Sequence, residues 1–548
     1  MRSMIALGMV IVGSVATAQG SPAAKAQQLR FIVRTNHVLT QAEEKSLARD
    51  GAYIYRHLPL INSVALSVDA RHWAKVSHEK FVEHFSPDLA VRKTDAFTVL
   101  NSLANVAWSK YNVSGKGVGV AIIDSGIRAT ADLNGRILGN ANFSPDATSA
   151  DDLCGHGTHV AGIVGGNGAN STGTKYSQTY SGIAPQVNLV NIRVLDSQGG
   201  GTVSQVIAGI TWAISTRLQY NTRVINLSLG HPVGESYKTD PLCQAVEAAW
   251  KTGMVVVVAA GNNGRLNATQ SSTQNNDGYG TAYGTITSPG NDPFVITVGA
   301  MKATNSSRNQ DTAASYSSRG PTRLDFVVKP DIVAPGNLVV STLSKNSTLF
   351  NQYSSQGGVP WSAYVKSPPT GLSTDYFQMS GTSMACPVVS GAVALMIQQN
   401  PLLSADTIKS RLMLSADKWV GPDGTGDLFT YGAGYLNIPA AINSGALALL
   451  YAKSPTSAHQ NNGNVTLNVT GSLLDVISGL SAGLLGLLNL DNLTGERAMW
   501  GERAMWGEDT VTPNRAMWGE GFWTDSSSYS VTHADALSII EKKKETHK

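Results

Sequence analysis

Cysteine is scarce in this chain of 548 residues, which contains only Cys154, Cys243 and Cys386. At most one disulfide can form within the chain, so disulfides do not organise the fold. Charge is also sparse, because charged residues make up 14% of the chain and the formal net charge is +3. A strong field that would attract nucleic acid or a membrane surface is therefore not expected.

The chain also lacks, at its amino end, an apolar run long enough to cross a membrane. Residues 4–15 are apolar, but a span requires ~20 such residues. Arg2 precedes this stretch and the small-x-small sequence Ala16-Thr17-Ala18 follows it. The pattern predicts a signal peptide over residues 1–18, hence a secreted protein with no membrane span after cleavage. A transmembrane anchor is the alternative interpretation.

The length predicts more than one structural unit. Residues 28–88 alternate short apolar runs with helix-like segments in the order β-α-β-β-α-β, which indicates a small α+β unit of the ferredoxin-like kind. The expected elements are a strand at 29–33, a helix at 40–49, strands at 52–57 and 61–68, a helix at 70–78 and a strand at 81–85. A unit of about 60 residues is only marginally stable by itself, so we expect it to pack against the unit that follows.

From about 105 to 445 the pattern changes to nearly continuous apolar strands separated by helices. The expected strands are 118–123, 189–194, 224–229, 254–260 and 294–298, with helices at 203–215 and 241–251. Such a pattern predicts an α/β fold of three layers, a parallel sheet with helices on both faces. Ligands of these sheets bind outside the carboxyl ends of the strands.

Beyond about 450 this order is lost. Residues 471–490 are rich in Leu, Gly and Ser, and the sequence Arg-Ala-Met-Trp-Gly-Glu then begins at Arg497, Arg503 and Arg515. Three short copies at unequal spacing do not make a solenoid. We expect residues 450–548 to form a mobile tail with tryptophan contact points, and a short β-repeat is the alternative.

Two polar residues occupy positions typical of a catalytic site. Asp124 ends the first apolar strand, although such an aspartate alone often only caps a helix or holds a turn. His156 lies in Gly-His156-Gly-Thr-His, at the start of a helical apolar stripe. A metal shared with His159 is an alternative interpretation, but no third ligand lies nearby in the sequence.

Two further candidates follow later in the chain. Ser383 precedes a helical stripe of apolar residues. Because proline is tolerated only in the first turn of a helix, Pro387 predicts that Ser383 lies at or just before the helix start. Free backbone N–H groups there favour an anion. Asn262 ends another buried strand, where its amide could donate to an oxyanion. A helix cap at Ser383 and a simple turn at Asn262 are the alternatives.

Together the segments Ile-Ile-Asp124-Ser-Gly, Gly-His156-Gly-Thr-His, Ala-Ala-Gly-Asn262 and Gly-Thr-Ser383-Met-Ala-x-Pro resemble the subtilisin-like serine protease family. The chain order Asp, His, Ser is the order known for subtilisin. The resemblance extends over most of residues 105–445. It implies a serine endopeptidase whose triad is Asp124, His156 and Ser383.

The resemblance also implies the remaining parts of the site. Asn262 and the Ser383 N–H would form the oxyanion hole. The substrate-binding residues would be Ser228, Leu229, Gly230, Gly200, Gly201, Ala260 and Gly261. The chemistry would need no cofactor. A structural calcium ion is an expectation whose ligands stay unassigned, because residues 165–182 depart from the family pattern.

For residues 28–88 the resemblance implies a propeptide that assists folding and inhibits the enzyme, with cleavage in the connector 88–105. A permanent accessory domain is the alternative. The expected partners are protein or peptide substrates, without nucleic acid, and the mature enzyme is expected to be a monomer. Residues 337–378 are expected to form an enlarged loop near the cleft, and Cys154 and Cys386 to be structural thiols near the site.

Other functions fit the sequence less well. An α/β-hydrolase would place its serine before its acid and histidine, whereas Ser383 comes last. His156 and Asn262 disfavour an acid-acting relative with glutamate as its base. An inactive adhesion or binding protein on the same scaffold is the alternative from another functional class.

Overall fold

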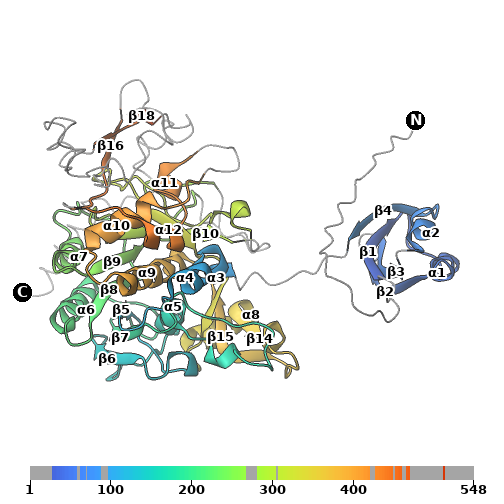
Figure 1. Cartoon of the computed structure of the whole chain (residues 1–548), viewed down its shortest axis with the longest axis horizontal. Helices are drawn as coiled ribbons and strands as arrows, with labels where there is room; N and C mark the ends of the chain where they lie inside the picture. The colour runs from blue at the N-terminus through green and yellow to red at the C-terminus, as the bar shows by residue number, and fades with distance from the viewer. Residues whose placement is uncertain are drawn as a thin grey trace, which may run out of the picture. The chain divides into compact units, whose positions relative to one another are not determined.

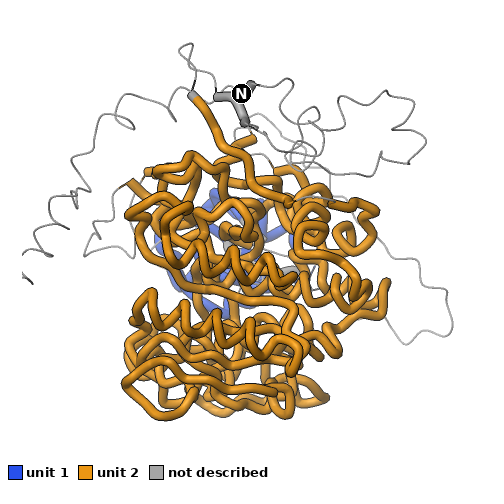
Figure 2. The backbone as a smooth tube through the Cα atoms, turned by 90° about the vertical axis from the view of Figure 1, so that its left-hand side faces the viewer, with its two compact units in different colours: residues 1–92 blue, residues 93–548 orange. Residues whose placement is uncertain are grey.

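A computed structural model describes residues 28–58, 62–69, 71–87, 97–266, 280–303, 307–419, 426–448, 451–459, 465–468 and 510–511. The chain divides into two compact units, residues 1–92 and 93–548 (Figure 2). The predicted signal peptide and the three hexapeptide repeats lie outside the described residues. No helix in these ranges is long and apolar enough to cross a membrane.

The first unit is a four-stranded antiparallel sheet with two helices. Its elements are β1 (Gln28–Thr35), α1 (Gln41–Arg49), β2 (Ala52–Leu58), β3 (Ser63–Asp69), α2 (Trp73–Ser77) and β4 (Val82–Pro87). The strands are arranged in the order β2-β3-β1-β4, and the order of elements along the chain is the predicted one. A capping box fixes the start of α1, since Thr40 and Glu43 bond each other's backbone N–H.

The second unit is built on an eight-stranded sheet. Its elements up to the end of this sheet are α3 (Phe97–Asn101), α4 (Ala104–Tyr111), β5 (Gly119–Asp124), β6 (Ile137–Asn142), α5 (His156–Gly165), β7 (Asn188–Arg193), α6 (Val203–Thr216), β8 (Thr222–Leu227), α7 (Pro241–Lys251), β9 (Val255–Ala259), β10 (Ile296–Lys302), β11 (Thr312–Ala313) and β12 (Ile332–Pro335). The strand order is β11-β10-β9-β8-β5-β7-β6, with β12 also paired to β10. All neighbours are parallel except β10 and β11.

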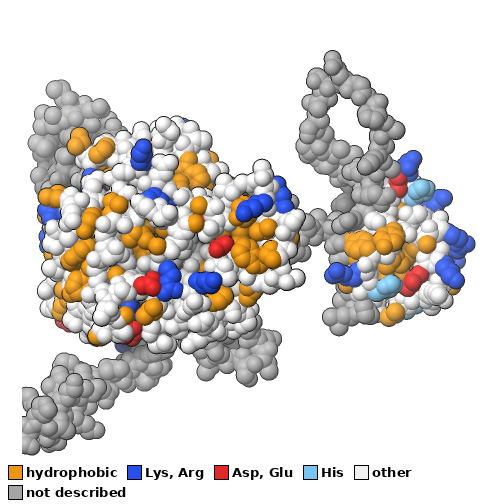
Figure 3. All heavy atoms as spheres, turned by 90° about the horizontal axis from the view of Figure 1, so that it is seen from below, with side chains coloured by type: hydrophobic (Ala, Val, Ile, Leu, Met, Phe, Trp, Pro, Cys, Tyr) orange, Lys and Arg blue, Asp and Glu red, His pale blue; other side chains and the backbone are white. Residues whose placement is uncertain are grey.

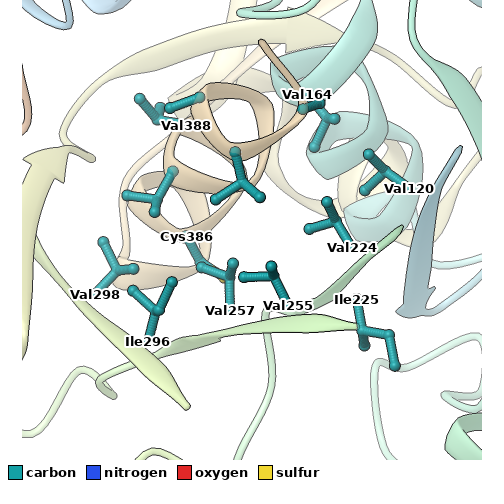
Figure 4. Close-up of a cluster of buried hydrophobic side chains, with 14 of the residues drawn as sticks. Val120, Val164, Val224, Ile225, Val255, Val257, Ile296, Val298, Cys386 and Val388 are labelled. Carbon is teal, nitrogen blue, oxygen red and sulfur yellow. The ribbon is translucent and has the colours of Figure 1, made fainter. Parts of the chain in front are cut away.

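Helices cover this sheet, and the predicted three-layer α/β fold is confirmed (Figure 1). Among these helices, α5 packs against α9 (Thr382–Gln399), and α6 packs against α7. Side chains of β5, β8, β9 and β10 meet those of α9 in a continuous apolar core, as Figure 4 shows. Because the strands are covered on both faces, they read as unbroken apolar runs in the sequence.

The predicted connector 88–105 is not a linker throughout. Residues 97–101 form α3, and α4 begins at residue 104. Asn101 is buried, and its Nδ2 donates to Asp311 Oδ2 at 2.8 Å. The carboxyl half of the connector is therefore part of the second unit, which begins before the predicted residue 105.

The expected loop at 337–378 is instead a small folded lobe. Its elements are β13 (Val339–Thr342), α8 (Thr348–Gly357), β14 (Gly358–Pro360) and β15 (Leu372–Met379), with the strand order β13-β15-β14. An aromatic cluster that includes Tyr180, Tyr364 and Tyr376 fills its interior. Since β15 ends four residues before Ser383, this lobe leads directly into the site.

The end of the described chain adds three helices and a small sheet. These elements are α10 (Ala405–Leu414), α11 (Leu428–Tyr431), α12 (Ile438–Asn443), β16 (Thr456–His459), β17 (Val465–Asn468) and β18 (Thr510–Val511). The strands form a separate sheet in the order β16-β17-β18. Ser454, just before β16, donates to the buried Asp331 at 2.5 Å, so this segment is joined to the second unit.

Candidate active site

Asp124 is the last residue of β5 and is completely buried. Its Oδ1 accepts hydrogen bonds from the backbone N–H of Ser125 and from His156 Nδ1, both at 2.7 Å. An ionised carboxylate can only accept hydrogen bonds, so His156 Nδ1 carries a proton and Nε2 is left as the basic nitrogen of a neutral ring. The predicted pair of acid and histidine is therefore in contact.

His156 is the first residue of α5 and keeps 18% of its side chain exposed. Gly155 precedes it with a φ of +105°, and a Cβ at Gly155 would lie 2.5 Å from Ser347 Oγ, so glycine is required. Burial lowers the pKa of His156. The charge and hydrogen bond of Asp124, together with the charge of Asp152, raise the pKa by more than burial lowers it. The net pKa lies above the usual value for histidine.

Asp152 is a supporting residue that sequence reasoning missed. It is completely buried, and its carboxylate accepts from the backbone N–H of Gly155 at 2.7 Å and of Thr158 at 2.8 Å. Ser125 Oγ also donates to it, at 2.9 Å. Asp152 thus binds free N–H groups at the start of α5 and fixes the turn that carries His156. The acidic pair just before the glycine-histidine segment is the signal that could have identified it.

His159 does not share a metal ion with His156. Its Nε2 lies within hydrogen-bonding distance of two backbone carbonyls, those of Val339 and Phe377. In the described ranges, no group of three or more His, Cys, Asp or Glu side chains is arranged to hold a metal. The metal interpretation of the two histidines is therefore wrong.

Ser383 lies in the first turn of α9, as predicted, but Pro387 does not lie in that turn, where it was predicted to be. The helix begins at Thr382, so Pro387 is inside it and beyond its first turn. A proline at this position cannot donate to the carbonyl four residues earlier, which is that of Ser383. Ser228 Oγ donates to that carbonyl instead, at 2.9 Å. The side chain of Ser228 therefore supplies the hydrogen bond that the proline removes.

The hydroxyl of Ser383 also points toward Ser228. Its Oγ donates to the backbone carbonyl of Ser228 at 3.1 Å. Ser383 and Ser228 thus exchange two hydrogen bonds, one through each side chain. The resting hydroxyl is held at the end of β8, beside the predicted substrate-binding residues.

Asn262 is exposed, and its orientation is fixed by Thr382. Its Oδ1 accepts from the backbone N–H of Thr382 at 2.9 Å and from the Thr382 hydroxyl at 3.1 Å. The amide nitrogen must therefore be the free end, and it lies 3.4 Å from where a Cβ of Gly381 would be. Two N–H donors consequently face the turn that carries Ser383, as an oxyanion donor requires.

The predicted substrate-binding residues fall into three segments. Ser228, Leu229 and Gly230 follow β8, and Gly200 and Gly201 lie exposed before α6. The backbone of Gly200 is already bonded to Asp196 through both its N–H and its carbonyl.

Ala260 and Gly261 have their backbone groups occupied as well. Ala260 bonds Val298 and Thr287, and Gly261 bonds Ser318 and the Thr382 hydroxyl. Gly261 has a φ of +104°, which favours glycine. These two residues hold Asn262 in position.

The cysteines are three buried free thiols. Burial, as the largest effect, raises the pKa of Cys154 to about 12 and raises the pKa of Cys386 and Cys243 as well. Cys386 donates to Asn226 within the core. Thiolate chemistry is therefore suppressed at all three positions, in agreement with structural thiols.

Residues 165–182, where the resemblance would place a calcium loop, contain no Asp, Glu, His or Cys. The nearest buried carboxylate, Asp132, already accepts from the Asn170 N–H and the Tyr376 hydroxyl, both at 2.7 Å. This segment therefore does not fit a calcium site built on side-chain carboxylates.

The chain is similar to several known proteins. The model of the family described as "Subtilase family" matches residues 115–434. Serine protease AprX of Bacillus subtilis is 40% identical over 359 residues, which cover 64% of this chain and 71% of the relative. Subtilisin DY of Bacillus licheniformis is 37% identical over 60% of this chain and 91% of its own. Subtilisin E of Bacillus subtilis is 30% identical over 78% of this chain and 93% of its own.

Proposed function

The chain belongs to the subtilase family of serine endopeptidases, and from that premise we propose that Asp124, His156 and Ser383 are its catalytic triad. The observation that carries this proposal is the 2.7 Å hydrogen bond between buried Asp124 and His156 Nδ1, which leaves Nε2 as a base. The substrates are proteins or peptides, as the family implies.

The resting bond of Ser383 suggests how substrate starts the reaction. Without substrate, the carbonyl of Ser228 accepts a hydrogen bond from the Ser383 hydroxyl. This carbonyl lies in the segment expected to pair with an extended substrate. A substrate N–H that binds this carbonyl would compete with the hydroxyl, which then turns to His156 Nε2. Substrate binding and activation of the nucleophile are thus coupled in this proposal.

In the chemical step, Ser383 Oγ attacks the scissile carbonyl carbon while its proton passes to His156 Nε2. Asp124 stabilises the imidazolium that forms. The negative charge on the substrate oxygen is stabilised by the amide of Asn262 and the backbone N–H of Ser383. His156 then returns the proton to the leaving amine, and water hydrolyses the acyl-enzyme by the same route. No step requires a cofactor.

We further propose that the protein is secreted after loss of residues 1–18 and that residues 28–88 are a propeptide inhibitor. The first unit exposes large hydrophobic side chains, among them Tyr53, Tyr55 and Phe85, and Figure 3 shows hydrophobic side chains gathered on one of its faces. Apolar surface of this kind fits a unit that docks on another protein surface.

The propeptide proposal predicts inhibition in trans. Residues 28–88, made separately and added to the purified mature enzyme, should inhibit hydrolysis of a peptide substrate in a saturable manner. A Tyr53→Asp variant of the piece should inhibit more weakly, because it replaces a side chain that is 69% exposed in this unit by a charge. An accessory domain, by contrast, would leave activity unchanged at every concentration.

The triad proposal is tested by the pH dependence of kcat/KM. Only neutral His156 can act as the base, so activity should rise with pH as the ring loses its proton. The ordinary histidine pKa is about 6.5, and the raised pKa of His156 places the midpoint at or above it. Activity should then stay high in the alkaline range. A maximum below pH 5 would contradict the assignment of His156 as base.

A further inference from the structure

His159 is the second histidine of the Gly-His-Gly-Thr-His segment, and none of the steps proposed above uses it. It lies on α5, three residues after His156, and is completely buried. Its Nε2 is 3.2 Å from the carbonyl oxygen of Val339 and 3.0 Å from that of Phe377. Carbonyl oxygens only accept hydrogen bonds, so Nε2 carries the proton and donates to both.

The ring keeps this protonation state at neutral pH. Its Nδ1 is buried and is among the side-chain atoms of the described chain that have no hydrogen-bond partner. Burial and the nearby charge of His156 lower the pKa of His159 to about 3. The ring is therefore neutral, with its single N–H on Nε2, and serves as a permanent donor rather than as a switch.

The two carbonyls belong to the strands of the lobe that leads into the site. Val339 begins β13, and Phe377 lies on β15, which pairs with β13 in an antiparallel ladder. After β15 ends at Met379, three residues separate it from Ser383. The ring thus connects the helix that begins with His156 to the strand that continues into Ser383.

Neighbouring contacts bring α5 close to this lobe but reach only one of its strands. Ser341 Oγ donates to the carbonyl of His159 at 2.8 Å, and Thr342 Oγ1 donates to that of Thr158 at 2.7 Å. A Cβ on Gly162 would lie 2.3 Å from both hydroxyl oxygens, so the close approach depends on glycine. Both hydroxyls are on β13, whereas the His159 ring also holds β15.

We propose that His159 is a positioning residue that sets the distance between His156 and Ser383 by joining α5 to both β13 and β15. This inference rests on the proposed triad. The ring touches neither substrate nor the reacting atoms. It acts through backbone that carries the base on one side and the nucleophile on the other, where a displacement of about 1 Å costs on the order of 100-fold in rate.

The test compares His159→Gln with His159→Met. A glutamine amide has roughly the reach of Nε2 and two N–H groups for the two carbonyls, whereas methionine fills similar space without a donor. For each variant, kcat and KM are measured on a chromogenic peptide amide, with active sites counted by titration. The rate of reaction with a fluorophosphonate reports separately on the geometry of Ser383 and His156. Leu412→Ala, in the buried face of α10, is the control for a general loss of stability.

We expect His159→Met to lose about 10- to 100-fold in kcat with little change in KM, and its reaction with fluorophosphonate to slow in parallel. His159→Gln should keep most of both rates. Leu412→Ala should lower the Tm and leave kcat per active site unchanged. Equal losses in the Gln and Met variants, or a Met variant with kcat within about 2-fold of wild type, would overturn the proposal.

A second pair covers the case in which the methionine variant does not fold. His159→Asn keeps an amide donor but is one methylene too short to reach both carbonyls, so its kcat should fall below that of His159→Gln. Equal kcat in these two variants would overturn the positioning role. The wild-type protein is assayed alongside: if it neither hydrolyses the peptide nor reacts with fluorophosphonate, the proposed triad itself is wrong, and the inference falls with it.

Discussion

Replacing Ser383 by alanine is expected to lower kcat by about a million-fold, the magnitude known for loss of the nucleophile in subtilisin. The hydroxyl is the group that forms the acyl-enzyme, and no buried thiol can replace it because burial raises the pKa of all three cysteines. Hydrolysis of a peptide amide, measured over days with purified protein, gives the residual rate.

The matched control is Ser355→Ala, on the exposed surface of α8. This variant should keep wild-type activity, because the hydroxyl of Ser355 donates a hydrogen bond to the side chain of the neighbouring Gln356 and not to the site. The Ser383→Ala protein should also accumulate as a precursor that retains residues 28–88. Normal trimming of this variant in a host without other proteases would show that maturation is not autocatalytic.

Replacing Asn262 by alanine is expected to lower kcat by about 100- to 1,000-fold with little change in KM, a range known for the corresponding donor in subtilisin. The hydrogen bond from Nδ2 to the oxyanion forms mainly in the transition state. It is therefore the chemical step, rather than binding, that loses stabilisation. Steady-state kinetics on a peptide amide separates the two.

Two further variants identify the cause of that loss. Asn262→Asp keeps an oxygen that can accept from Thr382 but has no N–H to donate, so its kcat should fall at least as far as that of the alanine variant. Asn263→Ala, at the exposed neighbouring position, should behave like wild type. If the aspartate variant recovered activity, the role of Asn262 would be to anchor Thr382, and the oxyanion donor would lie elsewhere.

The sequence predicted the sheet and the position of each candidate residue because these features are local. Apolar runs covered on both faces mark β5, β7, β8 and β9 to within two residues of their bounds. Asp124 and Asn262 follow the ends of such runs, and His156 and Ser383 fall at helix starts. Each of these placements depends on neighbouring residues in the chain.

The missed features depend on pairs of residues far apart in the chain. The hydroxyl of Ser228 supplies the bond that Pro387 removes, and nothing in either segment alone predicts this. For His159 a shared metal was the alternative interpretation, and its actual acceptors could not be predicted because they lie on β13 and β15, about 200 residues away. The lobe at 337–378 was interpreted as a loop because its strands are short and polar, and its core is an aromatic cluster completed by Tyr180.

The most direct test of the triad is site mapping of a fluorophosphonate adduct on the wild-type protein. We expect one adduct per molecule, on the peptide that contains Ser383. It should form faster as pH rises through the pKa of His156 and be absent from the Ser383→Ala variant. An adduct on another residue, or unchanged labelling of the Ser383→Ala variant, would contradict the assignment of Ser383 as the nucleophile.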